Sequence, residues 1–233
     1  MMDSRVLSLN AERLGIVLDE QKASSMVTYG ENLLIENKTT NLTAITDEEE
    51  FLNKHLCDSL TVASLPELTG RVADVGTGGG LPGVIIKLFR DELDVLLVDS
   101  TEKKLKAVTE ICKKMDIRVE TLHQRAEKMG ICEYRDYFDS VTARAVARLP
   151  QLLEFCLPLL KTGGFFLAMK GVNANSEIQN AKRAASILSG KLYRTVSFKL
   201  PGGYERVIAV YKKTGPTPKG FPRETGMILR KPL

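Results

Sequence analysis

The ten residues Asp74-Val75-Gly76-Thr77-Gly78-Gly79-Gly80-Leu81-Pro82-Gly83 carry the strongest structural signal in this 233-residue chain. They follow the short apolar run that begins at Val72 and lead into the apolar run that ends at Phe89. Glycines allow a tight backbone turn there and a close approach to a ligand. A strand, a glycine turn and a helix in this order predict the first unit of an α/β domain.

Strand and helix patterns alternate after residue 71. Five strand patterns are expected, at 72–75, 94–98, 118–122, 138–142 and 164–169. Such alternation predicts a parallel sheet with helices on both faces. Two further strands, 192–200 and 204–211, are joined so closely by 201–203 that they must be antiparallel. The prediction is a Rossmann-like, mostly parallel seven-stranded sheet with a terminal antiparallel hairpin, the layout of methyltransferases that use S-adenosylmethionine (SAM).

The first sixty residues have helical periodicity. Apolar residues from Leu7 to Leu18 share one helical face, a second helix ends near Asn37, and Asp47 with Glu50 forms a capping box that opens a third. The expected organisation has three parts: an N-terminal helical extension at 1–65, a SAM-binding methyltransferase domain at 66–213 and a basic C-terminal tail at 214–233.

Composition excludes several classes of protein. Hydrophobic residues are 43% and charged residues 27% of the chain, as in globular proteins. No apolar run approaches the roughly 20 residues of a membrane span, and the start lacks the layout of a secretory signal. The four cysteines form no C-x-x-C pair, which argues against a zinc or disulfide framework. A cytoplasmic protein without a metal site or membrane association is expected.

Two cofactor motifs compete at the glycine turn. The dinucleotide pattern G-x-G-x-x-G fits Gly78, Gly80 and Gly83, but Pro82 interrupts it and Asp74 stands inside the preceding strand. The pattern D-x-G-x-G-x-G, which suits SAM, consists of Asp74, Gly76, Gly78 and Gly80. A dinucleotide site and a purely structural turn remain as alternatives.

The acidic residues favour SAM. Asp74 can hold the ammonium of its methionine end, directly or through water. Asp99, at the end of the second strand, is placed to accept hydrogen bonds from both ribose hydroxyls. Ala126 and Glu127, after the third strand, are expected to flank the adenine.

Several blocks together resemble one family, RsmG, also called glucose-inhibited division protein B. The blocks are 41–43, His55 with 58–59, 74–83, 97–100, 144–145, 170–171 and 205–206. The resemblance covers about residues 28–212. It implies methyl transfer from SAM to N7 of a guanosine in 16S ribosomal RNA near the decoding site, with S-adenosylhomocysteine as product. The RNA or the small ribosomal subunit would be the partner, with no obligate protein partner.

The resemblance also implies roles for individual residues. Gly76 and Leu81 would line the methionine and ribose side of SAM, and Ala126 and Glu127 would sit at the adenine. Arg144 would reach the cofactor or the target from the end of the fourth strand. The family often has proline at the position of Gly79.

Guanine N7 offers a free lone pair, so its methylation needs no general base. In-line positioning, worth up to ~7–11 kcal/mol, is the expected contribution of the protein. The fourth strand is not followed by the D/N-P-P-Y/F element of amino-group methyltransferases, nor by a Pro-Cys nucleophile. A SAM enzyme acting on a small molecule or protein, a non-catalytic RNA-binding protein of this fold, and a dinucleotide oxidoreductase remain as alternatives.

Basic residues near strand ends or turns complete the expected site, because ligands bind there in α/β sheets. The catalytic candidates are Arg144, Lys170 and Arg206. The candidates for RNA contact are His55, Arg125, Arg148, Lys212 and Lys213. Arginine can donate to guanine O6 or to phosphate, while the competing role for each is a solvated or ion-paired surface residue.

Overall fold

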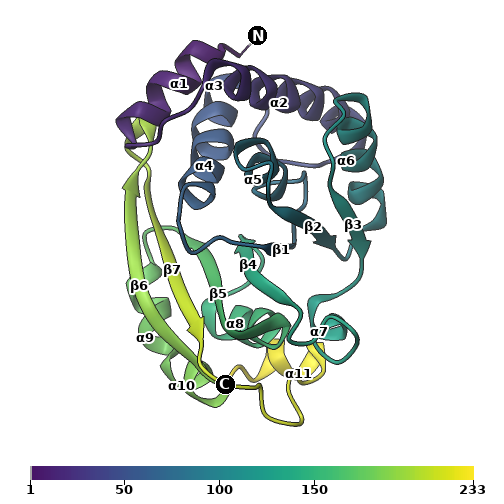
Figure 1. Cartoon of the computed structure of the whole chain (residues 1–233), viewed down its shortest axis with the longest axis vertical. Helices are drawn as coiled ribbons and strands as arrows, with labels where there is room; N and C mark the ends of the chain where they lie inside the picture. Colours follow the sequence, from purple (N-terminus) through teal and green to yellow (C-terminus); the bar gives the residue numbers. More distant parts are fainter. Residues whose placement is uncertain (1) are drawn as a thin grey trace.

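A seven-stranded sheet in the order β3-β2-β1-β4-β5-β7-β6 is the middle layer of the computed structural model, which describes residues 2–233 (Figure 1). The strands are β1 (Arg71–Val75), β2 (Asp94–Asp99), β3 (Glu120–His123), β4 (Phe138–Arg144), β5 (Leu160–Lys170), β6 (Gly190–Lys199) and β7 (Glu205–Lys213). The first five are parallel, and β7 runs antiparallel to both β5 and β6. The predicted fold class is confirmed.

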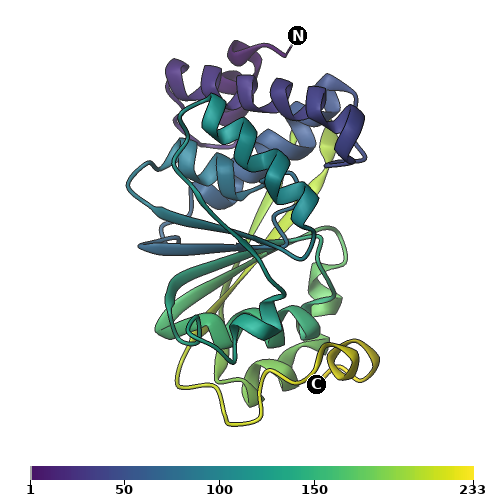
Figure 2. The ribbon, with the colours of Figure 1, turned by 90° about the vertical axis from the view of Figure 1, so that its right-hand side faces the viewer.

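The helices of the N-terminal extension, together with the two that follow β1 and β2, cover one face of the sheet (Figure 2). They are α1 (Ser4–Arg13), α2 (Glu20–Thr40), α3 (Glu48–Phe51), a π-helical turn η1 (Leu52–Cys57), α4 (Asp58–Ala63), α5 (Gly83–Phe89) and α6 (Glu102–Lys114). One apolar cluster joins Leu7 of α1 and Leu33 of α2 to Val108 of α6 and Leu97 of β2. The N-terminal extension therefore shares its core with the sheet.

The opposite face carries the remaining helices (Figure 2). They are α7 (Ala126–Met129), α8 (Leu149–Cys156), a 3₁₀ turn η2 (Leu157–Leu159), α9 (Ala174–Asn180), α10 (Lys182–Ile187) and α11 (Thr225–Arg230), with a further 3₁₀ turn, η3 (Pro201–Gly203), between β6 and β7. The segment between β5 and β6 forms two short helices, α9 and α10, which meet at Ala181. No helix within residues 2–233 is long and apolar enough to span a membrane.

Several of the expected boundaries differ from the structure, and three of them are instructive. The first helix ends at Arg13, so Leu18 lies beyond it, although its side chain still packs against the same core. The second helix continues to Thr40 and ends at Asn41, which adopts a left-handed conformation with φ 50°. The third strand begins at residue 120 instead of 118.

The strand order also locates the site. The strand order reverses between β1 and β4, which are parallel neighbours in the sheet: β2 and β3 are added on the β1 side, and β5 is added on the β4 side. In open α/β sheets ligands bind at such a switch point, outside the carboxyl ends of the strands. The glycine turn after β1 and the loop after β4 meet there.

Candidate active site

The glycine turn is tied to the neighbouring strand by its backbone. The amides of Gly76 and Thr77 donate to the carbonyl of Val98 at 2.8 and 3.0 Å. Gly76 and Gly78 have φ values of 72° and 56°, which favour glycine. Open space lies where a side chain at Gly78 would begin, whereas one at Gly76 would meet Cγ2 of Val146 at 2.3 Å. The turn therefore presents bare backbone at Gly78.

The second half of the turn faces the protein interior. A Cβ on Gly80 would lie 2.2 Å from the hydroxyl of Tyr29, and that hydroxyl donates to the carbonyl of Gly79 at 2.8 Å. Leu81 belongs to the apolar core. Gly80 and Leu81 thus shape the turn from behind, and their predicted contact with the cofactor stays a prediction.

Asp74 is a fully buried carboxylate, and only one of its two oxygens accepts hydrogen bonds within residues 2–233. Its Oδ2 accepts hydrogen bonds from the Thr77 hydroxyl at 2.6 Å and from the Gly83 amide at 2.9 Å. Its Oδ1 accepts none within residues 2–233. Burial raises the pKa of Asp74 to about 6. An unpartnered carboxylate oxygen can accept a hydrogen bond from an ammonium group, so the chemistry of Asp74 fits the implied cofactor, although Asp74 is fully buried and is not among the residues that line the two cavities described below.

Asp99 stands beside a cavity of about 260 Å³. Its Oδ2 accepts from the Gly78 amide at 2.9 Å and its Oδ1 from the Thr101 amide at 2.8 Å, which fixes the carboxylate in place. The cavity is lined by residues including Gly76, Asp99, Ala126, Glu127, Val146, Thr225 and Leu229. Gly76, Asp99, Ala126 and Glu127 were all predicted to bind the cofactor, and the structure brings them to one cavity. Arg125 lines it as well.

A second cavity of about 670 Å³ lies at the carboxyl ends of β4 and β5. Basic side chains dominate its polar lining: Lys54, Arg144, Arg148, Lys170 and Arg206, against Asp58 and Glu177. Val146 lines both this cavity and the one beside Asp99. The two cavities are therefore neighbours, separated by the loop that follows β4. We call the larger one the basic cleft.

An ion-paired cluster forms one side of the basic cleft. Oδ2 of Asp58 lies 3.1 Å from Nη1 of Arg144, and its Oδ1 lies 3.3 Å from Nε of Arg206. Only 4% of the Asp58 side chain is exposed. Arg144 ends β4 and Arg206 lies near the start of β7, so one carboxylate holds side chains from two strands together. Asp58 was not predicted as a site residue, although it lies in a block that carries the family resemblance.

His55 is held neutral beside these arginines. Its Nε2 lies 2.7 Å from the Thr43 hydroxyl, and its Nδ1 has no hydrogen-bond partner within residues 2–233. Burial, followed by the charge of Arg144, lowers the pKa of His55 to about 3. A histidine with this pKa is a very weak base at neutral pH.

Lys170 is engaged with the loop that follows β4. Its Nζ donates to the carbonyl of Ala147 and pairs with Oε2 of Glu177, both at 2.8 Å. Glu177 also accepts from the amide of Leu149 at 2.7 Å. These contacts favour a role for Lys170 in fixing residues 147–149. Neither Glu177 nor Val146 was singled out from the sequence, because their positions depend on how α9 and the loop fold over the site.

The structure separates the predicted RNA contacts. His55 and Arg148 line the basic cleft, and Arg125 lines the adjacent cavity. Lys212 is near the end of β7 that is remote from Arg206. Lys213 is fully buried, where its Nζ donates to the Leu157 carbonyl at 2.7 Å and to the Thr217 hydroxyl. A contact of Lys213 with RNA does not agree with this burial.

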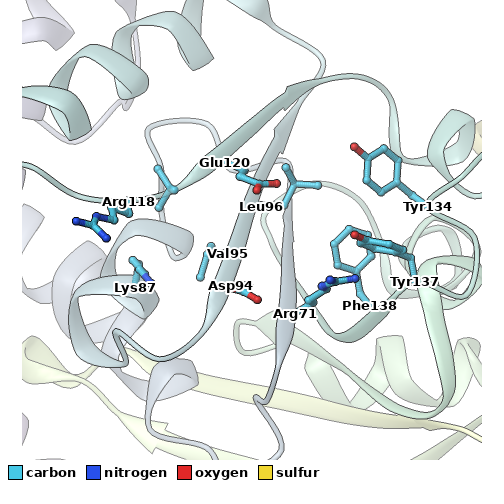
Figure 3. A pocket seen from close by; sticks show the side chains of 11 residues that line it. Arg71, Lys87, Asp94, Val95, Leu96, Arg118, Glu120, Tyr134, Tyr137 and Phe138 are labelled. Carbon is cyan, nitrogen blue, oxygen red and sulfur yellow. The ribbon is translucent and has the colours of Figure 1, made fainter.

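A further cavity, of about 720 Å³, lies at the opposite edge of the sheet (Figure 3). It is lined by the amino-terminal ends of β1, β2, β3 and β4, and the Arg71 guanidinium lies 4.8 Å from the ring centroid of Tyr137. It contains no residue of the glycine turn. Its position at the amino ends argues against cofactor binding there. Within residues 2–233 no cluster of three metal-binding side chains exists.

The strand order, the glycine turn and the acids at β1 and β2 define a SAM-dependent methyltransferase. Solved structures share the fold: "M. jannaschii TYW2 in complex with AdoMet" has a TM-score of 0.55 at 17% identity, covering 67% of this chain and 74% of that chain. "P. horikoshii TYW2 in complex with MeSAdo" has a TM-score of 0.54 at 12% identity, covering 68% and 62%.

Sequence comparison identifies the family. The model of the GidB family, described as rRNA small subunit methyltransferase G, matches residues 22–208. A "Ribosomal RNA small subunit methyltransferase G" of Acetivibrio thermocellus is 40% identical over 242 residues, covering all of both chains. One of Desulfitobacterium hafniense is 41% identical over 228 residues, covering 97% of this chain and 95% of the relative. The chain belongs to this family, and the resemblance seen in its motifs is confirmed.

Proposed function

We propose that this protein transfers a methyl group from SAM to N7 of a guanosine in the decoding region of 16S ribosomal RNA. The proposal is based on the residues that line the basic cleft, next to the cavity beside Asp99. None of these lining residues, among those described at 2–233, is suited to accept a proton from the substrate at neutral pH. When bound, the cofactor supplies a methyl group on a positively charged sulfur and leaves as S-adenosylhomocysteine.

The acid and base groups of the cleft support N7 as the target. Asp58 is paired with two arginines, and Glu177 is paired with Lys170 and with a backbone amide. His55 has a pKa of about 3. Methylation of an amino group or a hydroxyl requires loss of a proton, whereas N7 has an in-plane lone pair. A cleft without a free base near pH 7 suits the second reaction.

Arg144 is the best-placed residue to orient the base. Its Nη1 donates to Asp58 at 3.1 Å and to the Lys54 carbonyl at 3.4 Å. Its Nε and Nη2 donate no hydrogen bond to other residues at 2–233, so these groups are available for guanine O6 or for a phosphate. The pairing with Asp58 fixes the guanidinium before the RNA binds, which reduces the entropy lost on binding.

We propose that Arg206 and Arg148 anchor the RNA backbone at the rim of the cleft, with Arg125 at the adjacent cavity. A-form RNA hides N7 in a deep, narrow groove, so the target base must be splayed out of a duplex or lie in a loop. The helical extension 1–65 would contribute His55 and Asp58 to the methyltransferase domain 66–213. We place this activity in the cytoplasm, where ribosomal subunits are found, without an obligate protein partner.

The test is methyl transfer from labelled SAM to small ribosomal subunits from a strain that lacks this gene. Nuclease digestion and mass spectrometry then identify the labelled nucleoside. Subunits from the parent strain, whose site is already methylated, are the control. Label in N7-methylguanosine is the expected result. SAM binding without label in the RNA would refute the ribosomal assignment and favour a small-molecule or protein methyltransferase.

A further inference from the structure

The C-terminal segment, residues 214–233, lies outside the residues matched by the family model but against the cavity beside Asp99. Figure 1 shows α11 beside α7 and α8. Two of its side chains, Thr225 and Leu229, line that cavity. Ile228, on the same helix, is fully buried in the core under this face of the sheet.

The segment is fixed by buried charged groups. Glu154 of α8 is completely buried, and its carboxylate accepts from Nε of Arg223 at 2.8 Å, from Nη2 at 2.6 Å and from the backbone amide at 2.9 Å. The guanidinium of Arg135 donates to the carbonyls of Thr217 and Phe221 at 2.7 and 2.8 Å. Bidentate pairs of this kind fix geometry as well as contribute energy. These contacts hold α11 in place beside the cavity.

A hydrogen bond between Thr225 and Glu127 connects the C-terminal segment to the cavity beside Asp99. The hydroxyl of Thr225 donates to Oε1 of Glu127, a residue that is only 6% exposed. No residue at 2–233 donates to Oε2 of Glu127. A hydrogen bond to one oxygen restricts rotation of the carboxylate and fixes the direction in which the second oxygen accepts. Adenine carries an exocyclic amino group that donates, so an oriented carboxylate would recognise it.

We propose that the C-terminal segment is a working part of the cofactor site, in which Thr225 positions Glu127 to accept the adenine amino group and Leu229 covers the ring. Thr225 is a positioning residue, since it acts through Glu127. The inference rests on the proposed function, because it assumes that the adenosine end of SAM occupies this cavity.

The experiment is calorimetric titration of the full-length protein with S-adenosylhomocysteine and with S-inosylhomocysteine, which has a carbonyl in place of the amino group. Thr225→Val removes the hydroxyl and keeps the branched shape. Thr225→Ser keeps the hydroxyl, so this variant should bind the ligands as the wild type does. We expect Thr225→Val to weaken S-adenosylhomocysteine binding about tenfold, the scale of one hydrogen bond to a charged group. We also expect a smaller preference for the amino ligand.

A second pair of variants tests whether Leu229 of α11 covers the adenine ring. Leu229 and Met227 are each 51% exposed on α11, but only Leu229 lines the cavity. Leu229→Ala is expected to weaken S-adenosylhomocysteine binding several-fold, while Met227→Ala leaves it unchanged. Wild-type affinity in both Thr225→Val and Leu229→Ala would overturn the inference. So would a lower unfolding midpoint of Thr225→Val with an undiminished preference for the amino ligand. Failure of the wild-type protein to bind S-adenosylhomocysteine would instead refute the proposed function.

Discussion

Replacing Asp74 by asparagine should make the free protein more stable and the cofactor site weaker. In the folded state burial raises the pKa of Asp74 to about 6 from the usual 3.8. The folded protein thus binds the proton more tightly than the unfolded chain does, and the free energy of unfolding falls as pH rises from 3.8 to 6. Well above pH 6, Asp74 is ionised in both the folded and the unfolded state, so the buried charge lowers the free energy of unfolding by its full amount.

The size of the effect follows from that difference in pKa. At about 1.36 kcal/mol for each pKa unit, the charge costs about 3 kcal/mol at pH 8 and about half of that at pH 5. The asparagine side chain in the Asp74→Asn variant would be neutral at both pH values, and its carbonyl oxygen can still accept from Thr77 and Gly83. For a chain of this size, about 3 kcal/mol corresponds to a rise of roughly 6–12 °C in the unfolding midpoint.

The assay is denaturant unfolding of both proteins at pH 5 and pH 8, with SAM titration of each by calorimetry. We expect Asp74→Asn to be more stable than the wild type, with a larger difference at pH 8, and to bind SAM more weakly. A difference in stability that is the same at both pH values would refute the argument from burial. Wild-type affinity for SAM in this variant would refute the assigned contact with the ammonium.

Other perturbations test the remaining parts of the site. Gly76→Ala should cost about 1–2 kcal/mol from its φ of 72° and weaken SAM binding through the contact with Val146, whereas Gly163→Ala, also at positive φ but in open space, should lower stability alone. Arg223→Ala should leave Glu154 buried and unpaired, and lower the free energy of unfolding by about 3–5 kcal/mol in urea titrations. The KM for the ribosomal substrate, measured at increasing salt, should rise steeply while the Kd for SAM changes little, because phosphate contacts release counterions; equal salt dependence of the two would contradict an RNA-binding cleft.

The fold could be predicted from the sequence because its signals are local. Strand runs, helical spacing and the glycine turn each depend on neighbouring residues, and the short link between β6 and β7 leaves only an antiparallel pair. Helix ends are harder to predict: Asn41 ends α2 through a left-handed conformation that asparagine adopts only in some contexts.

The candidate site could be predicted only in part. Asp74, Asp99 and Arg144 are found at strand ends, where topology alone predicts ligand contact. The contribution of Asp58 depends on how its helix packs against β4, where Asp58 meets Arg144. The contribution of Thr225 depends on its hydrogen bond to Glu127, which is 98 residues away in the sequence. The charge of Lys213 suggests a surface position, but its burial depends on tertiary contacts with Leu157 and Thr217 that the local sequence does not predict.

The charges of the basic cleft affect the release of the methylated RNA as well as the binding of the unmodified RNA. Its basic side chains outnumber its acidic ones, which attracts the phosphates of RNA. In the proposed reaction, methyl transfer would move the positive charge from the sulfur of the cofactor to N7 of the guanine, which the proposal places close to Arg144 and Arg206. The same cleft that attracts the unmodified RNA therefore repels the methylated base. Because Asp58 is already paired with both arginines, it offers little compensation to the product. Fixed positive charge thus favours binding before methyl transfer and release after it.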